Sequence, residues 1–432
     1  MPDTKSDKRN PWLWIPSLYY AEGIPYVIVM TVSVIMYKRL DISNTDIALY
    51  TSWLYLPWVI KPLWSPFVDI IGKKRNWIIF MQLLIGGGLA GVALTIPLPG
   101  FFQYSLAFLW LLAFSSATHD IAADGFYMLG LSTHQQAWFV GYRSTFYRLS
   151  MITGQGLLVI LAGFLENSTK SIPLAWSITF FILTGFFVAF FIYHKFILPY
   201  PKADVSARKD ESSSIFNEFL KTFAAFFKKK NIGIILSFIL LYRLAEAQLV
   251  KISSPFLLDS QEVGGIGLTT SEIGLVYGTI GVICLTLGGI IGGIVIAKQG
   301  LKYWLWPMVL AINVPDLVYV YLAYSQTTNL FMISFMVALE QLGYGFGFTA
   351  FMLFLIYASE GEYKTSHYAI ATGFMALGMM IPGMWSGWLQ ELIGYQHFFL
   401  WICIATIPGF IVTKFVKIDS EFGKKKEEPA KA

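Results

Sequence analysis

The stretch Thr118-His119-Asp120-Ile121-Ala122-Ala123-Asp124-Gly125-Phe126-Tyr127 places two aspartates and a histidine inside an apolar run between about Tyr104 and Leu131. On a helix, Asp120 and Asp124 lie one turn apart and share a face. An ionised side chain at mid-bilayer costs about 2.5–3.5 kcal/mol on insertion scales, so these groups need partners or water. The stretch therefore predicts either a salt bridge that joins two helices or the polar wall of a substrate or proton pathway.

The composition of the whole chain is that of a membrane protein. Of 432 residues, 56% are hydrophobic and 13% are charged, whereas soluble domains carry about 25% charged residues. We therefore predict an all-α polytopic membrane protein. A spanning helix needs about 20 apolar residues, and about twelve such spans are predicted at residues 12–38, 46–70, 76–97, 103–131, 136–164, 174–198, 232–258, 270–297, 303–325, 329–357, 366–390 and 396–415.

The basic residues predict the orientation of these spans. They flank the chain ends, follow the second and eighth spans and fill the central loop, all on one side if the number of spans is even: Lys5, Lys8, Arg9, Lys73, Lys74, Arg75, Lys202, Arg208, Lys209, Lys221, Lys228–Lys230, Lys298, Lys302, Lys414, Lys417 and Lys424–Lys426. Both termini are therefore expected in the cytoplasm, with Lys38 and Arg39 as the exception. The net charge of +5 indicates membrane orientation rather than nucleic-acid binding, and no cleavable signal peptide is expected.

The central polar segment divides the chain into two six-helix bundles. We predict an N-terminal bundle at residues 1–198, a cytoplasmic linker at 199–231, a C-terminal bundle at 232–418 and a basic cytoplasmic tail at 419–432. Within the linker, Ile215–Lys230 is either a solvated connection or an amphipathic helix on the inner leaflet. In the second case one side of the helix would carry Phe216, Phe219, Phe223 and Phe227.

Ionisable residues inside the spans are unevenly distributed. They concentrate on the first, fourth, seventh and tenth spans, and the acids and one histidine among them are candidates for proton coupling: Glu22, His119, Asp120, Asp124, Glu246 and Glu340. His119 is either a relay beside Asp120 or a hydrogen-bonded packing group. Asp316 in the ninth span breaks the pattern, and we attribute it only to a polar kink after Pro315.

Two ion pairs are predicted between the fourth and fifth spans. A short loop joins these spans, so they should be antiparallel neighbours. Counting from the span ends places Asp124 at the depth of Arg143 and Asp120 at the depth of Arg148. Each pair would either hold the helices together or take part in coupling.

Neither a catalytic nor a metal or cofactor site is predicted. Cys284 and Cys403 lie in apolar runs, and the five histidines are dispersed. An integral hydrolase would need a nucleophile–base pair or metal ligands in a cavity, and near His119 only Ser115 and Ser116 offer weak candidates. A sensor would usually carry a soluble output domain. A membrane-embedded enzyme or sensor is thus the disfavoured alternative.

Two loops in corresponding positions resemble the G-x-x-x-D-[RK]-x-G-x-[RK] motif of the major facilitator superfamily. They are residues 65–75 and 293–302, each an imperfect copy. The resemblance implies twelve helices in two bundles, with the first, fourth, seventh and tenth lining a central cavity. It also implies a conformational latch on the cytoplasmic side, formed by Asp69, Gly72, Lys74 and Arg75.

The N-terminal half resembles a narrower group, the AmpG-type muropeptide permeases and the related acetyl-coenzyme A transporters. Asp120-Ile-Ala-Ala-Asp124 is similar to their Q-D-I-x-x-D run, with His119 where glutamine is usual. Lys61-Pro-Leu-Trp-Ser-Pro66 with Asp69 is similar to K-x-L-W-S-P-x-x-D, Gly141-Tyr-Arg143 to G-Y-R, and Gly23-Ile-Pro25 to G-[IL]-P. The C-terminal half matches only in general layout.

The resemblance implies proton-driven import of anhydro-muropeptides, which are sugar–peptides of the cell wall, by a monomer in the bacterial cytoplasmic (inner) membrane. Such a substrate needs aromatic platforms, hydrogen-bonding groups and a cation for its carboxylate. The candidates for these contacts are Tyr26, Tyr55, Lys61, Arg143, Arg148, Arg243, Gln248, Gln341 and Tyr344. The alternative within the same fold is another substrate, such as a sugar, an acetyl-coenzyme A-like compound or an exported drug.

Overall fold

The computed structural model describes residues 9–205, 220–361 and 363–424, and within these ranges the secondary structure is helical, without strands. Ten stretches are long and apolar enough to cross a membrane. The last of them, Ser366–Phe415, bends at Gly394, whose φ of 76° and ψ of 165° are not helical, so it counts as two. Adding α3 (Asn44–Trp53) and α4 (Leu56–Ile70) gives the predicted number of about twelve spans.

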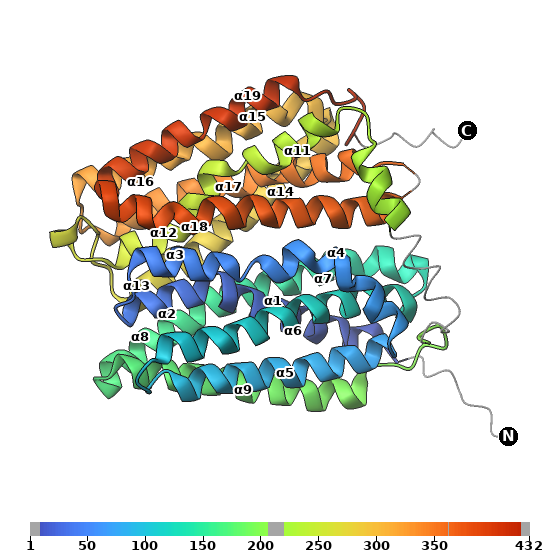
Figure 1. Cartoon of the computed structure of the whole chain (residues 1–432), viewed down its shortest axis with the longest axis horizontal. Helices are drawn as coiled ribbons and strands as arrows, with labels where there is room; N and C mark the ends of the chain where they lie inside the picture. The colour runs from blue at the N-terminus through green and yellow to red at the C-terminus, as the bar shows by residue number, and fades with distance from the viewer. Residues whose placement is uncertain (1–8, 206–219, 362, 425–432) are drawn as a thin grey trace. The chain divides into compact units, whose positions relative to one another are not determined.

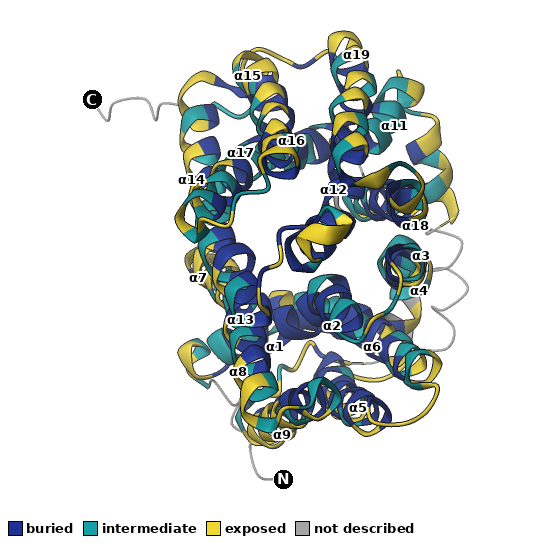
Figure 2. Cartoon of the chain, turned by 90° about the vertical axis from the view of Figure 1, so that its left-hand side faces the viewer, coloured by how far each residue is buried: buried dark blue, intermediate teal, exposed yellow. Residues whose placement is uncertain are grey.

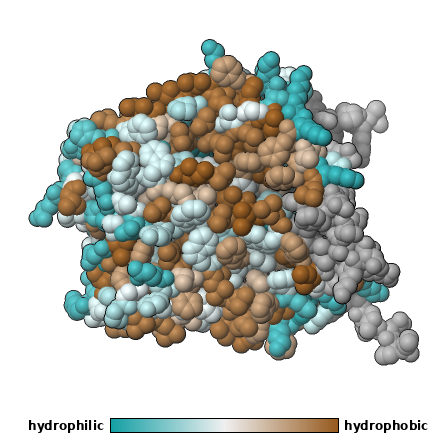
Figure 3. All heavy atoms as spheres, in the orientation of Figure 1, coloured by the Kyte–Doolittle hydropathy of each residue, from teal (hydrophilic) through white to brown (hydrophobic). Residues whose placement is uncertain are grey.

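The surface of the helices is apolar, as lipid contact requires. Figure 3 shows hydrophobic side chains along the helices and hydrophilic side chains gathered toward their ends. Phe186, Phe196 and Phe331, for example, are 54%, 68% and 80% exposed. Helices satisfy their own backbone hydrogen bonds, which hydrocarbon cannot do. The chain is therefore built to lie in a bilayer.

The chain divides into two compact units that follow its two halves, with one exchange. Unit 1 contains residues Met1–Ser43, Tyr50–Lys221 and Thr269–Gly278. Unit 2 contains residues Asn44–Leu49, Thr222–Leu268 and Thr279–Ala432. Each unit thus includes a short segment from the other half of the sequence.

Unit 1 is built around a long central helix, α6. Its helices, shown in blue to green in Figure 1, are η1 (Pro11–Leu13), α1 (Ile15–Val27), the π-helix η2 (Ile28–Val32), α2 (Ser33–Arg39), α4, α5 (Lys74–Thr95), α6 (Phe101–Gly130), α7 (Thr133–Met151), the π-helix η3 (Ile152–Leu157), α8 (Leu158–Thr169) and α9 (Ile172–Ile197), and the inserted α13 (Thr270–Ile273), in yellow, belongs to them. Helix α5 contacts α6 and α9, and α1 contacts α6 and α7. Buried residues gather where α5 and α9 lie side by side (Figure 2).

Unit 2 has its core between α11, α15 and α17. Its elements are α11 (Ile232–Leu241), α12 (Leu244–Leu258), η4 (Gln261–Val263), the end of the π-helix η5 (Gly274–Gly281), α14 (Val282–Gln299), α15 (Leu301–Asn313), η6 (Val314–Asp316), α16 (Leu317–Ser325), α17 (Leu330–Ala358), α18 (Lys364–Ala405) and α19 (Ile407–Phe415). Phe238, Tyr242 and Phe351 are fully buried there, with Tyr242 stacked on Phe351 at 5.2 Å between ring centroids.

The two short segments that belong to the unit of the other half, Thr269–Gly278 and Asn44–Leu49, pack with their backbones close to neighbouring helices. A Cβ atom on Gly278 would lie 1.8 Å from the carbonyl oxygen of Gln155 in unit 1, and one on Gly387 would lie 1.9 Å from that of Asn44 in unit 2. Small residues allow such contacts between helices in lipid. In unit 2, the Asn44 side chain also donates hydrogen bonds to Gln390 at 2.6 Å and to Tyr395 at 2.8 Å.

The predicted linker helix lies partly outside the described residues, which exclude Phe216 and Phe219. Residues 220–227 are helical. Phe226 is fully buried against the core of unit 2, whereas Phe227 is 40% exposed. The described part of this segment therefore packs on protein.

Candidate functional site

In unit 1, three carboxylates and two cations from four helices meet beside Tyr19. One oxygen from each of Glu22, Asp120 and Asp124 lies within 4.8 Å of the others. Lys61 on α4 donates a hydrogen bond to Asp120. Glu22 on α1 completes the set, and its Oε2 has no hydrogen-bond partner among the described residues. Asp120 thus has the partner that an ionised group within a membrane span requires.

The second ion pair of this cluster is the predicted one, between Asp124 and Arg143. Arg143 Nη2 lies 2.6 Å from Asp124 Oδ1. The Arg143 guanidinium also lies over the ring of Tyr19 at 4.6 Å and that of Tyr127 at 5.4 Å, as cation–π contacts do. Two aromatic rings and one carboxylate therefore fix the direction of this cation.

Asp120 pairs with Lys61 rather than with Arg148, contrary to our expectation. Our expectation counted residues from the span ends and did not consider the direction in which each side chain points. Arg143 and Arg148 are five residues apart, which is about 140° around a helix, so both cannot face α6. The side chains of the two pairs are 23–38% exposed, so the cluster is open enough to exchange partners.

His119 lies apart from the acids, in a network between α5, α6, α9 and α1. Its Nε2 is 3.1 Å from the amide nitrogen of Gln82, whose side chain also bonds to Nδ1 of His194. His194 Nε2 is 2.9 Å from the hydroxyl of Ser17. These side chains, apart from Ser17, are at most 1% exposed. The arrangement is that of a polar packing network, and sequence analysis missed Gln82 and His194 as its members.

Unit 2 brings together Glu246 on α12, Asp316 in η6 and Glu340 on α17. One oxygen from each lies within 4.8 Å of the others, and their exposed fractions are 2%, 1% and 2%. Glu340 accepts a hydrogen bond from Gln341 at 2.9 Å and a long one from Tyr319 at 3.5 Å. We call this set the unit 2 trio and the set Glu22, Asp120 and Asp124 the unit 1 trio.

The remaining substrate candidates lie in several places. Arg243 donates to the hydroxyl of Tyr344 and lies 4.8 Å from the ring centroid of Phe348. Gln248 accepts a hydrogen bond from Trp401 at 2.9 Å. In unit 1, Tyr26 packs edge-on against Trp58 at 5.3 Å, and Tyr55 is 6% exposed. Of the predicted substrate contacts, Arg243 and Tyr344 therefore contact each other. Gln248 instead accepts from Trp401, which the sequence analysis did not consider.

The proposed latch has partners that the sequence did not reveal. Gly72 has a φ of 82°, which suits a glycine turn. The backbone amides of Lys74 and Arg75 donate to the carboxylate of Asp204 at 2.7 and 3.1 Å. The Arg75 guanidinium lies 4.0 Å from the ring centroid of Tyr200. Asp204 therefore provides the anion at the start of α5, and the side chain of Asp69 lies outside the described structure.

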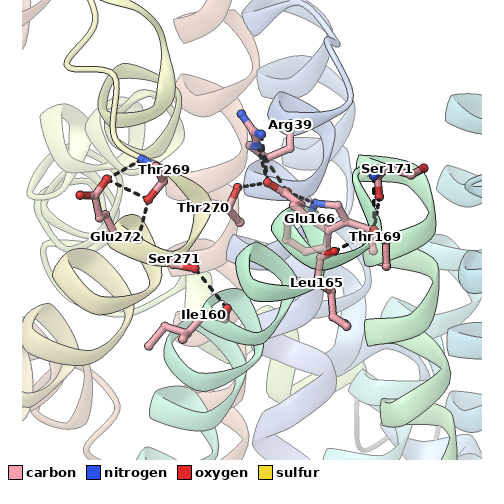
Figure 4. A network of polar contacts seen from close by, with 11 residues as sticks. Arg39, Ile160, Leu165, Glu166, Thr169, Ser171, Thr269, Thr270, Ser271 and Glu272 are labelled. Carbon is pink, nitrogen blue, oxygen red and sulfur yellow. Dashed lines mark hydrogen bonds and ion pairs between the residues drawn. The ribbon is translucent and has the colours of Figure 1, made fainter.

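Arg39, the exception to the charge rule, is paired inside unit 1. Figure 4 shows Glu166 between Arg39 and Thr270. Arg39 Nη2 lies 2.9 Å and Thr270 Oγ1 lies 2.7 Å from Glu166 Oε2, and the indole of Trp176 donates to Oε1 at 3.0 Å. A basic residue at this end of the spans is tolerated because Glu166 neutralises it.

Comparison with known proteins places this architecture in a family. Residues 19–381 match the Major Facilitator Superfamily. The chain belongs to this superfamily. It is thus a transporter rather than an enzyme, and a multi-pass protein of the inner membrane.

Relatives of this major facilitator protein confirm the narrower resemblance. It is 24% identical to the anhydromuropeptide permease of Escherichia coli (strain K12) over 408 residues, which are 91% of this chain and 77% of that protein. It is 25% identical to the putative transporter AmpG 4 of Rickettsia conorii over 409 residues, 91% of this chain and 93% of that one.

Solved structures agree on the fold. The D-xylose-proton symporter superposes with a TM-score of 0.72 at 11% identity, covering 96% of this chain and 99% of its own. The nucleoside transporter NupG, as a D323A mutant, gives 0.71 at 15% identity, covering 94% and 100%. At such identities the likeness establishes the arrangement of helices alone.

Proposed function

We propose that this major facilitator transporter imports anhydro-muropeptides, the N-acetylglucosaminyl-anhydromuramyl sugar–peptides, into the cytoplasm together with protons. The observation that carries the substrate class is the match to an anhydromuropeptide permease over 91% of the chain. The observation that carries the coupling is the unit 1 trio, which holds one more acid than it has paired cations.

The charge count locates the proton. Lys61 and Arg143 offset two of the three carboxylates. Glu22 has no paired cation among the described residues, and its Oε2 has no hydrogen-bond partner there, so it needs a proton to be neutral in this place. Asp120 already pairs with Lys61, so the proton lies on Glu22, which is 6% exposed.

The same cluster offers a way to couple that proton to the substrate. A lactyl or peptide carboxylate would compete with Asp124 for Arg143, or with Asp120 for Lys61, and the guanidinium suits a bidentate contact. The aspartate released in this way adds negative charge beside Glu22. Substrate binding and proton binding would therefore favour each other.

Other candidates complete the proposal. Tyr26 and Tyr55 in unit 1, and Tyr344 and Gln341 in unit 2, would offer ring faces and hydrogen bonds to the sugars. Arg148, Arg243 and Gln248 stay predictions as substrate contacts, and Glu246 and Glu340 stay predictions as proton sites. The transporter would act as a monomer that exposes its site to each side of the membrane in turn.

Uptake into proteoliposomes tests the proposal. Radiolabelled N-acetylglucosaminyl-anhydromuramic acid should accumulate when the outside is made acidic, and a protonophore should abolish the accumulation. Xylose, nucleosides and acetyl-coenzyme A serve as competitors. Inhibition by one of these, with no uptake of the anhydro-sugar, would transfer the function to another substrate. Uptake that ignores the pH gradient would remove the proton coupling and leave a facilitator.

A further inference from the structure

The unit 2 trio joins three segments that are far apart in the sequence. Glu246 follows the break between α11 and α12, where Arg243 has a φ of −112° and a ψ of 23°. Asp316 ends the 3-10 turn Val314–Asp316 that separates α15 from α16. Glu340 lies within the continuous helix α17. Interrupted helices carry ion sites in transporters, because their ends can bring ligands to one point.

Two of these carboxylates are buried without the partners that burial demands. Both oxygens of Glu246 and both of Asp316 lack a hydrogen-bond partner among the described residues. Asp316 is 1% exposed, comes from a different element than the two glutamates, and directs an oxygen to within 4.8 Å of theirs. Buried ionisable groups are normally paired, hydrogen-bonded, bound to a metal or neutralised by a proton. The first two forms of compensation are not met here for Asp316.

The charges around the trio are also unbalanced. Arg243 acts on Glu246 with an attractive interaction, but its side chain is directed to Tyr344 and Phe348. Lys251 on the same helix as Glu246 is five residues further on, about 140° around the helix. Tyr319 and Gln341 donate to Glu340, and Cys403 lies near Asp316. None of these three groups carries a positive charge toward the carboxylates.

We propose that the unit 2 trio is a sodium ion site. The three oxygens lie within 4.8 Å of one another, which is close enough for one cation to contact all three. Ligands made only of oxygen select hard cations over zinc or copper. The site goes beyond proton-driven import, because it gives the second half of the protein an ion of its own.

Ligand number separates sodium from the divalent ions. Glu246 and Asp316 offer four oxygens, and Glu340 offers one more beside the oxygen that Tyr319 and Gln341 engage. Calcium takes 6–8 oxygens, and magnesium keeps several waters in a near-ideal octahedron. A trio at most 2% exposed suits neither requirement as well as a monovalent ion that sheds its water readily.

Equilibrium binding of ²²Na⁺ to the purified full-length transporter, without any muropeptide, tests this site. Choline chloride keeps the ionic strength constant. We expect saturable binding of one ion per chain, and Asp316→Asn and Glu246→Gln should each weaken it by about tenfold or more. Glu262→Gln, which removes an exposed acid outside both trios, is the control and should bind sodium as the unchanged protein does.

The possible outcomes are distinct. A lack of saturable binding to the unchanged protein, or unchanged binding in both unit 2 variants, would overturn the sodium site and leave the trio to protons. Displacement of sodium by micromolar calcium would also overturn it, in favour of a divalent ion. Gel filtration and thermal unfolding of each variant separate lost binding from lost folding. Because muropeptide is absent, failure here leaves the proposed transport function untouched.

Discussion

Two carboxylates of the unit 1 trio are paired with cations, whereas the carboxylates of the unit 2 trio are buried and two of them have no hydrogen-bond partner in the described structure. In unit 1, Asp120 and Asp124 each have a paired cation, and these side chains are 23–38% exposed. In unit 2, Glu246 and Asp316 are at most 2% exposed and both oxygens of each lack a hydrogen-bond partner in the described structure. Both trios have the same number of acids and oxygen spacings within the same limit.

The different exposure of the two trios determines which of them can respond to an organic anion. The paired side chains of unit 1 are 23–38% exposed, so a second anion can reach the cations. A carboxylate of the substrate can therefore replace one partner in unit 1. The sealed trio of unit 2 has no such pair to exchange, so its ligand must be small. We therefore expect anion exchange in unit 1 and ion binding in unit 2.

The largest effect is expected from Glu22→Gln. Glutamine keeps the shape but cannot release a proton, so uptake driven by a pH gradient should fall to the level seen without a gradient. Exchange of labelled for unlabelled substrate, which needs binding but no net proton movement, should persist. Both are measured in proteoliposomes. Glu262→Gln, which removes an exposed acid, is the control for lost charge. Gradient-driven uptake that survives in Glu22→Gln would move the coupling proton out of unit 1.

The second effect concerns the pair Asp124–Arg143. Each single reversal, Asp124→Arg or Arg143→Asp, leaves two like charges facing each other and should prevent both folding and transport. The double reversal should restore a folded protein, judged by gel filtration and thermal unfolding. It should not restore transport, because it moves the cation from beside Tyr19 and Tyr127 to α6 next to Asp120.

Full transport by the double reversal would show that this pair only joins two helices. In that case the exchange of partners assigned to unit 1 would rest on Lys61 and Asp120 alone. The single variant Asp120→Asn separates the two outcomes, since it removes the other pair and leaves Arg143 with its rings.

For unit 1, the sequence predicted the membrane spans and the contacts between helices joined by a short loop. It did not predict the direction in which each side chain points. The spans follow from hydropathy, and Asp124–Arg143 follows from a short loop between neighbouring helices. The partner of Asp120 could not be obtained in this way, because it depends on how α4 packs on α6. His119 follows the same rule: it is about 100° around the helix from Asp120, so it faces Gln82 on α5 while Asp120 faces Lys61.

Asp316 shows the limit for unit 2. The sequence marked it as out of place in the ninth span, next to Pro315, and the structure has a 3-10 turn at that point. Its neighbours Glu246 and Glu340 are 70 and 24 residues away in the sequence, on other helices. Contacts of this kind follow from tertiary packing and leave no periodic signal. Gln82, a lone amide in an apolar span, was a signal that sequence analysis could have used.

A smaller effect, on stability, is expected from Arg39→Met. The pair Arg39–Glu166 serves as a reference because we expect it to stabilise unit 1 without taking part in transport. Arg39→Met leaves Glu166, 9% exposed, with hydrogen bonds from Thr270 and Trp176 only. Removing one partner of a buried pair costs about 3–5 kcal/mol, and the 30% exposure of Arg39 reduces this to about 2 kcal/mol. Thermal unfolding in detergent measures it.

The matched control for Arg39 is Arg39→Lys, which keeps the charge and should recover about half of the loss, since lysine cannot form the forked contact. Proton coupling, measured as the dependence of uptake on the pH gradient, should be unchanged in both variants. A changed coupling would contradict the structural role and extend the functional cluster of unit 1 to Glu166.

The smallest effect is expected from Tyr344→Phe, which tests how Arg243 is held beside the unit 2 trio. The change removes the hydroxyl that accepts from Arg243 and keeps the ring, and Phe348 still lies 4.8 Å from the guanidinium. A hydrogen bond contributes about 0.5–1.5 kcal/mol net, so unfolding should be easier by about 1 kcal/mol. Tyr303→Phe, at a ring that is 64% exposed, is the control.

If sodium binding strengthens in Tyr344→Phe, Arg243 has moved away from the trio and its charge opposes the bound ion. If binding weakens, Arg243 has moved toward Glu246 and competes for its oxygens. Unchanged binding would mean that the two rings alone fix the cation, and the contrast between the units would then depend on burial rather than on this arginine.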